Sequence, residues 1–326
     1  VSLGYNLYFR ETDYGEFNVA NYLTNSNGFG AQFGYPISDI TRLGFNITYD
    51  KTDIDVGSLP AREIYDFVSA EGNIFETLSA QLSWQRVTLN RGLFPTDGAS
   101  TVLSFSSTIP GSDLSYYRLN VRQRYYQPLT QNLVFGFQGE LGYLNAYGDT
   151  EETPFFQNFY AGGPRSLRGF ESNTLGPRST DAPCYEFNYA EGTCPNLLDI
   201  DGDGELDTPY YNPYANQTSR YRDAPIGGNI KIEGSLQLIF KLPFIEDQRS
   251  LRSAFFFDFG NVFSDNCKEY QINCSEPSID DLRYSYGVGI TWITGFGPMS
   301  LAIAKPTNAG PRERTEEFQF TVGNVF

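Results

Sequence analysis

The 326-residue sequence contains no histidine. This absence removes the usual general base of serine and cysteine hydrolases, and it also removes the commonest zinc ligand. Carboxylate and Ser–Lys chemistry stay open, but no convergent carboxylate pair stands out, so we expect no enzymatic activity. The chain also has no excess of positive charge, because it contains 39 acidic and 23 basic residues. Nucleic acid is therefore not an expected partner, since phosphate binding needs clustered Lys and Arg.

Long apolar runs are also missing. No stretch of about 18 apolar residues occurs, which excludes a membrane-spanning helix. The mean hydropathy of −0.37 would suit a soluble chain. However, 16% of the residues are aromatic, 32 are Gly and only one is Met. Enrichment in aromatic residues together with frequent Gly favours β-strands over helices.

Cysteine is scarce, and its four copies fall into two close pairs. Cys184 lies ten residues before Cys194, and Cys267 lies seven residues before Cys274. Short spacing within polar segments favours two local disulfides formed in an oxidising compartment. Metal binding is the alternative interpretation, although neither pair forms a C-x-x-C motif.

The dominant pattern in the chain is a two-residue alternation. In Leu282–Trp292, apolar or aromatic residues alternate with polar or small ones, as they do in Leu43–Tyr49 and Leu78–Trp84. This period predicts β-strands with one apolar face. We expect about twelve of them, near residues 1–11, 26–36, 41–51, 74–89, 99–108, 114–127, 133–147, 229–241, 252–264, 282–293, 297–305 and 316–326.

Two architectures fit this alternation: a soluble sandwich and a transmembrane barrel. The expected strands have the length that a tilted membrane strand needs, about 9–12 residues. Charged residues such as Arg118, Arg122, Glu140 and Glu233 lie on the polar faces, which suits a wet lumen. Short turns at Pro36–Ile40 and Thr294–Phe296 alternate with long loops at Asp13–Asn25, Thr52–Asn73, Asp265–Asp281 and 149–228. The sequence therefore predicts an all-β, antiparallel transmembrane barrel of the bacterial outer membrane.

The final segment supports this location. Phe318, Phe320, Val322 and Phe326 share one face of the last expected strand. A terminal aromatic residue on an amphipathic last strand is typical of the sorting signal of outer-membrane proteins. The alternative is an ordinary last strand without a sorting role.

An acidic motif lies within the long segment 149–228. Its carboxylates match the first positions of an EF-hand calcium loop, but position 12 is Tyr210 where a bidentate Glu is expected. A weak structural calcium site and a solvated acidic turn are both open, and we expect no other cofactor. The candidate ligands are Asp199, Asp201, Asp203, Glu205 and Asp207.

The long segment also contains the most specific motif of the chain. Residues 158–170 read NFYAGGPRSLRGF, in which the Gly pair allows close backbone packing and Arg168 offers a planar donor fork for a carboxylate. Arg168, Gly169 and Phe170 match the R-G-F motif of the BamA family, the barrel subunits of the β-barrel assembly machinery. The chain resembles that family over nearly its whole length, also in RGLFPTDG at 91–98, TIPGSD at 108–113, SNTLGPR at 172–178, FFDFG at 256–260 and the terminal FQFTVGNVF.

The resemblance implies where Arg168 should lie. In the family this loop folds into the lumen, where its arginine contacts acidic residues of the wall. Asp258 matches one of these acids, and its inward parity agrees. The second position, usually Glu, is Gln237 here, so a clamp of two carboxylates is not matched. Glu233 has the same inward parity and is the alternative partner.

The resemblance further implies a truncated sequence. The family barrel has sixteen strands preceded by periplasmic POTRA domains, and this chain begins at a stretch that matches the fifth strand. One domain is therefore expected over 1–326, with 149–228 as an extracellular loop insertion. Twelve strands could close on themselves, or the sheet could keep an open edge at each end.

The implied function is the folding and insertion of nascent β-barrel proteins into the outer membrane. An incoming strand would pair at a weak seam formed by Phe318–Phe326, where Gly323 and Asn324 weaken the lipid-facing pattern. Expected partners are nascent outer-membrane proteins, lipid, lipopolysaccharide and accessory lipoproteins. Two alternatives remain: a polypeptide-secretion transporter of the same superfamily and a passive porin.

Overall fold

Twelve antiparallel strands form one curved sheet in the computed structural model of this protein. The structure describes residues 1–17, 19–20, 22–56, 61–180, 224–242, 245, 250–268, 271, 274–295, 297–310 and 312–323. The strand order is β1-β2-β3-β4-β5-β6-β7-β9-β10-β11-β12-β14. These strands are β1 (Ser2–Asp13), β2 (Tyr22–Ser38), β3 (Thr41–Val56), β4 (Ile74–Val87), β5 (Gly98–Thr108), β6 (Tyr116–Thr130), β7 (Leu133–Ala146), β9 (Ile230–Phe240), β10 (Leu251–Phe263), β11 (Arg283–Thr294), β12 (Gly297–Pro306) and β14 (Phe318–Val322).

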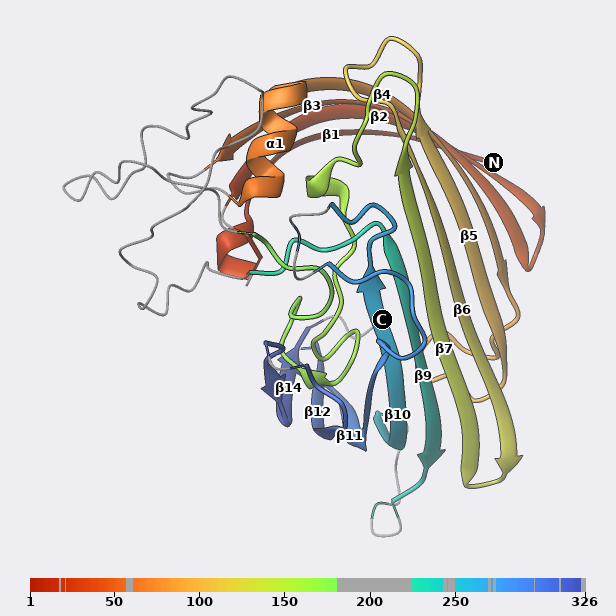
Figure 1. Cartoon of the computed structure of the whole chain (residues 1–326). Helices are drawn as coiled ribbons and strands as arrows, with labels where there is room; N and C mark the ends of the chain where they lie inside the picture. Colours follow the sequence, from red (N-terminus) through yellow and green to blue (C-terminus); the bar gives the residue numbers. More distant parts are fainter. Residues whose placement is uncertain are drawn as a thin grey trace.

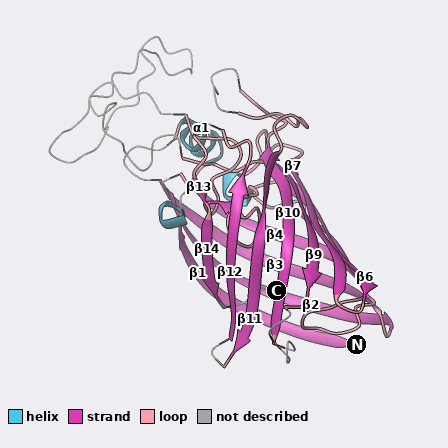
Figure 2. Ribbon diagram, turned by 90° about the horizontal axis from the view of Figure 1, so that it is seen from below, coloured by secondary structure: helices cyan, strands magenta, loops and turns pink. Residues whose placement is uncertain are grey.

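The sheet curves around a lumen, and its first and last strands are not paired with each other among the described residues. Every strand pairs with its neighbours in the sheet, so the topology is that of an up-and-down barrel wall (Figures 1 and 2). Among the described residues, no ladder joins β1 to β14. The described strands therefore form an open barrel wall with β1 and β14 as its edges.

The predicted alternation separates the two faces of this wall. On β1, Leu3, Tyr5, Leu7 and Phe9 are 64–80% exposed. The same holds on the other strands, where outward apolar residues such as Phe105 and Trp292 are largely exposed. An apolar surface this continuous is unstable in water but is matched to hydrocarbon. The fold is thus a transmembrane antiparallel β-barrel, as the sequence predicts.

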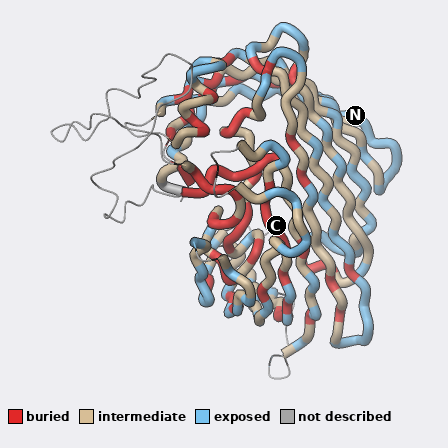
Figure 3. Tube along the Cα trace, in the orientation of Figure 1, coloured by how far each residue is buried: buried red, intermediate tan, exposed pale blue. Residues whose placement is uncertain are grey.

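The packed core lies inside the lumen. The segment that follows β7 enters the concave side of the sheet and carries the short elements η2 (Phe155–Gln157) and β8 (Gly169–Phe170). Its buried side chains pack against inward residues of the wall, and Figure 3 shows the buried segments concentrated there. One cluster consists of Leu144, Phe159, Ala161, Leu167, Phe170, Leu175 and Val262.

Three expected boundaries were wrong. The predicted loop Thr52–Asn73 contains the end of β3 and a helix, α1 (Arg62–Glu71). Its Ile64 and Phe67 are buried at helical spacing, and Gly72 ends it at φ 95° with its N–H bonded to Val68 O. The predicted loop Asp13–Asn25 is shorter, because η1 (Tyr14–Phe17) leads almost directly into β2.

The third error concerns the last strand. The predicted continuous strand 316–326 is divided into β13 (Thr315–Glu316) and β14. The first piece pairs with β8 in the lumen, whereas the second pairs with β12 in the wall. The physical reason is competition for backbone partners, because the lumenal segment takes the N–H and C=O groups that would otherwise extend the ladder with β12.

No described helix is long and apolar enough to cross a membrane. Cys267 and Cys274 form a disulfide in the connection between β10 and β11, as the spacing predicted. The other predicted pair, Cys184 and Cys194, lies outside the described residues.

Candidate functional site

Arg168 and Asp258 form a two-pronged ion pair inside the barrel. Arg168 donates from Nε to Asp258 Oδ2 and from Nη2 to Oδ1, both at 2.7 Å. The Arg168 backbone N–H also donates to Oδ2 at 3.2 Å. Asp258 is fully buried, and the Arg168 guanidinium carbon lies 3.4 Å from the centre of the Phe256 ring. Burial strengthens each of these contacts, because little water competes for the charges.

The wall strands create the space for this pair. Asp258 on β10 faces the lumen, and its cross-strand neighbours are Ser235 on β9 and Ser285 on β11. Ser235 Oγ accepts a further bond from Arg168 Nη2 at 3.0 Å. On β11, a Cβ on Gly289 would lie 3.6 Å from Arg168 Nη1, so a larger side chain there would meet the guanidinium. Small residues at these inward positions therefore admit a large guanidinium.

The two residues after Arg168 join the loop to the end of the chain. Gly169 and Phe170 form β8, which pairs with Glu316 and Thr315 of β13. Gly169 has φ 90°, and a Cβ there would lie 3.1 Å from the Ala304 Cβ. A side chain at Gly169 would therefore be strained in both backbone conformation and packing.

Gln319 links the last strand of the wall to this loop. Its Oε1 accepts from the Gly169 N–H at 3.2 Å, and its Nε2 donates to the Phe170 carbonyl at 2.7 Å. Gln319 is 2% exposed, so leaving these groups unpaired would be unfavourable. The loop motif and the edge strand β14 are therefore held together by side-chain and backbone bonds.

Of the other two wall candidates, Glu233 contacts the loop, but neither contacts the Arg168 side chain. Glu233 accepts a hydrogen bond from the Ser166 hydroxyl and lies 3.0 Å from Lys231 Nζ. Gln237 donates to Ser235 Oγ at 3.2 Å. The second acceptor for the Arg168 side chain is therefore the Ser235 hydroxyl, not the Glu233 carboxylate or the Gln237 amide.

A second anchor holds the loop at the outer end of the barrel. The Thr180 N–H lies 3.0 Å from both carboxylate oxygens of Glu63, and the Arg62 N–H donates to the Thr180 carbonyl. Glu63 is buried at the start of α1. Burial raises the pKa of this carboxyl above its ordinary value, against the opposing effect of the Thr180 hydrogen bonds.

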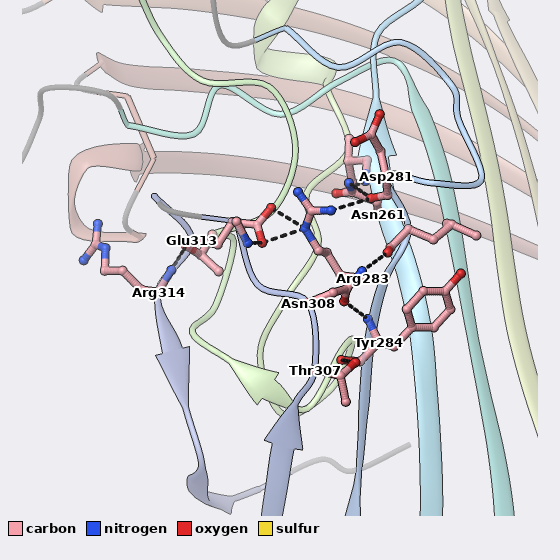
Figure 4. A network of polar contacts seen from close by, with 12 residues as sticks. Asn261, Asp281, Arg283, Tyr284, Thr307, Asn308, Glu313 and Arg314 are labelled. Carbon is pink, nitrogen blue, oxygen red and sulfur yellow. Dashed lines mark hydrogen bonds and ion pairs between the residues drawn. The ribbon is translucent and has the colours of Figure 1, made fainter.

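The connection between β12 and β13 is fixed by a polar network, drawn in Figure 4. Arg283 Nε lies 2.7 Å from both carboxylate oxygens of Glu313, and Arg283 Nη1 donates to the Asp281 carbonyl. Asn308 accepts from the Tyr284 N–H and donates to the Leu282 carbonyl. These contacts position the chain just before β13, where it pairs with the loop motif.

The seam candidates lie on β14 and directly after it. Phe318, Phe320 and Val322 are 50–61% exposed and face outward. Gly323 follows at φ 109°, and its N–H bonds to the Pro298 carbonyl. Phe326 lies outside the described residues, as do the calcium candidates Asp199, Asp201, Asp203, Glu205 and Asp207. Within the described ranges, no group of three or more Cys, Asp or Glu residues could hold a metal ion.

Sequence reasoning missed four side chains of this site. They are Ser166, Ser235, Phe256 and Gln319. Strand parity places Ser235, Phe256 and Gln319 on the lumenal face, so the alternation could have identified them as candidate lumenal residues. Parity does not reveal which loop atoms they contact, because that depends on how the segment 147–180 folds.

The fold and this site define a class of protein: an outer-membrane β-barrel whose lumen holds a loop locked to the wall by a buried arginine–aspartate pair. The model of the Omp85 superfamily domain matches residues 1–326. The chain therefore belongs to the Omp85 superfamily.

Comparisons with individual proteins agree with this assignment. The outer membrane protein assembly factor BamA of Neisseria meningitidis serogroup B is 28% identical, with 100% of this chain and 40% of that protein covered. The crystal structure of BamA from Haemophilus ducreyi lacking POTRA domains 1–3 matches with a TM-score of 0.77 and 25% identity, covering 98% of this chain and 58% of that chain. This chain thus spans less than half of the Neisseria relative.

A more distant structure shares the fold alone. CdiB from Escherichia coli matches with a TM-score of 0.51 at 10% identity, over 98% of this chain and 48% of that chain. The lower score and identity place this chain nearer to the BamA barrels than to CdiB.

Proposed function

We propose that this chain is the membrane-embedded barrel of an outer-membrane protein assembly factor, which folds nascent β-barrel proteins and inserts them into the membrane. The observation that carries the proposal is the short edge strand β14. It pairs with β12 through five residues, from Phe318 to Val322, whereas β11 and β12 pair through ten. An incoming strand could add to its free backbone groups by β-augmentation.

The lumenal loop gives this edge a defined position. The Arg168–Asp258 pair fixes the loop to β10, and Gln319 fixes β14 to the loop. A short ladder by itself would fray readily, because each lost pair exposes backbone that can bond to water. In this proposal, the loop keeps β14 ordered and aligned while its outer edge stays open to a substrate strand.

The proposal includes the partners of the whole protein. These are nascent outer-membrane proteins, membrane lipid, lipopolysaccharide and accessory lipoproteins, with POTRA domains preceding the barrel and residues 149–228 forming an extracellular insertion. The activity is physical, so no covalent chemistry, nucleic acid or catalytic cofactor takes part. A calcium ion bound by the acidic motif after Asp199 would have a structural role only.

Two other functions use the same barrel class. A polypeptide-secretion transporter would pass a chain through the lumen, and a porin would conduct ions. The lumenal loop disfavours the porin, since Arg168, Leu167 and Phe170 occupy the interior and are buried or largely buried there. Single-channel conductance separates the porin from the insertase: the proposed insertase should show low and irregular conductance, and a porin should show a large and steady one. A secretion transporter would instead carry a polypeptide across the liposome membrane, which the proposed insertase should not do.

The direct test is an assembly assay with the whole protein that carries this chain. It is reconstituted in liposomes, supplied with an unfolded β-barrel substrate, and the folded substrate is scored by its heat-modifiable mobility in gels. We expect folding to be faster than in liposomes without the protein, and Arg168→Ala to abolish most of the gain. Equal folding with and without the protein would reject the proposal.

A further inference from the structure

The connection between β4 and β5 forms a rigid turn at the end of the barrel opposite the long loop. Asn90 Oδ1 accepts from the Thr96 N–H at 3.1 Å, and Asn90 Nδ2 donates to the Thr96 hydroxyl. At the tip, Phe94 has φ 49° and is 7% exposed. A buried aromatic residue in a left-handed conformation shows that the turn holds Phe94 inward instead of releasing it to solvent.

This turn covers a cavity of about 960 Å³. The turns after β6 and β9 and the start of β10 complete its walls. Apolar side chains, among them Phe94, Val134, Ile239 and Leu251, form one part of its lining beside polar and charged ones. The volume is within the range, roughly 300–1,000 Å³, of sites that bind small molecules or short peptide segments.

The charges that line the cavity have one sign. Arg91, Lys241 and Arg252 are its charged residues, and none of its described lining residues is Asp or Glu. This is unusual in a chain with a net charge of −16. Among the described residues, none of these three cations forms an ion pair, whereas the lumenal cations Arg168 and Lys231 do.

Of these three cations, Arg252 is the one that lies against aromatic rings in the lumen. Its guanidinium lies 4.8 Å from the Tyr126 ring centre and 6.0 Å from that of Phe94, while its buried Nη2 has no hydrogen-bond partner. Arg252 shares the parity of Asp258, so it faces the lumen and not the lipid. The Nη2 atom is closed off from the cavity, but the rest of the half-buried guanidinium faces no carboxylate among the described residues and is available to pair with the carboxylate of a ligand.

We propose that this cavity binds a carboxylate of an extended polypeptide, with an adjacent aromatic or aliphatic side chain against the apolar wall. Guanidinium groups match the planar geometry of carboxylates, and the three cations would neutralise the buried charge. The lumenal position favours a chain that enters from the aqueous side over a bilayer lipid. The inference rests on the proposed function and makes this cavity a site of substrate recognition.

The test measures peptide binding to the full chain in detergent by fluorescence anisotropy. Three labelled nonapeptides are compared: FQFTVGNVF, the sequence of residues 318–326, with a free carboxylate, the same peptide amidated, and an amidated version carrying one internal Glu. We expect the free acid to bind at least about tenfold more tightly than the plain amide. A tenfold change corresponds to about 1.4 kcal/mol, close to the lower limit of the usual contribution of a hydrogen bond to a charged group.

Substitutions then locate the site. Arg91→Gln and Arg252→Gln should each weaken binding of the free acid about tenfold. Arg42→Gln is the matched control, because Arg42 begins β3 at the same end of the barrel and does not line the cavity. Arg91 is exposed on the turn, so its substitution should leave the fold intact. If Arg252→Gln fails to fold, the effect of Arg91→Gln on peptide binding therefore tests the site.

The outcomes are distinct. Binding of the free acid alone assigns the α-carboxylate, and binding of the Glu peptide as well assigns carboxylates in general; both support the site. Equal binding of all three peptides, an equal effect of Arg42→Gln, or binding of only phosphate or phosphatidylglycerol vesicles would overturn it. If peptide binding is absent while assembly activity is normal, the proposed function stands without this site; if assembly is absent while peptides bind, the function fails.

Discussion

Removing the Arg168 side chain should release the lumenal loop from the wall. Arg168→Ala deletes both guanidinium bonds to Asp258 and the bond to Ser235. It leaves a fully buried carboxylate whose remaining donor within the described residues is a backbone N–H at 3.2 Å. Breaking one side of a buried ion pair typically costs about 3–5 kcal/mol.

This magnitude can be measured by hydrogen exchange. Exchange through loop opening should accelerate in residues 166–172 by roughly 10²- to 4 × 10³-fold, since about 1.4 kcal/mol corresponds to a factor of ten. Arg168→Lys should be intermediate, because it keeps the charge without the planar fork. Arg124→Ala is the control, as Arg124 on β6 also faces the lumen but its side chain is exposed.

The double variant Arg168→Ala/Asp258→Ala separates two explanations. It removes the unpaired carboxylate, so it should destabilise the loop less than the sum of the single variants. Protection in Arg168→Ala within threefold of the wild type would refute the reasoning, because the loop would then be held by packing alone.

Three further results are expected. Gln319→Leu leaves the Phe170 carbonyl and Gly169 N–H unpaired and should speed exchange of the β14 amides about tenfold, with the β11 amides unchanged. Gly169→Ala should lower the thermal midpoint by several degrees because of the positive φ and the crowded Cβ, whereas Gly295→Ala, in open space, should not. The raised pKa of Glu63 means that burial of this carboxyl at the start of α1 contributes most to stability below its ordinary pKa of 4.5, and that this contribution is lost as pH rises through the folded-state value. Protection factors of the α1 amides should therefore fall from acid to neutral pH, and Glu63→Gln should remove that dependence.

The alternation was sufficient to predict the barrel wall. Each residue in a strand faces either lipid or lumen, so Phe255 and Phe257 are exposed while Phe256 and Asp258 are buried. The motif at Arg168 and the parity of Asp258 point to the same contact, and the two side chains lie 2.7 Å apart. Local chemistry of this kind can be read from a single sequence.

The structure differs from the prediction where segments distant in the sequence compete for the same backbone hydrogen-bond partners. The last strand reads as continuous by parity, but Thr315 and Glu316 leave the wall to pair with Phe170 and Gly169. No local pattern encodes a partner about 145 residues away. The helix α1 was missed for another reason, because a single buried face of ten residues resembles a loop with scattered apolar residues.

The central claim is that β14 receives the substrate strand. A photoreactive residue at Phe320, exposed on β14, should cross-link a nascent barrel protein during assembly. The same residue at Leu119, exposed on the mid-wall strand β6, should not. Cross-linking at Phe320 alone is the predicted result, and equal cross-linking at both positions, or none at Phe320 while assembly proceeds, would contradict it.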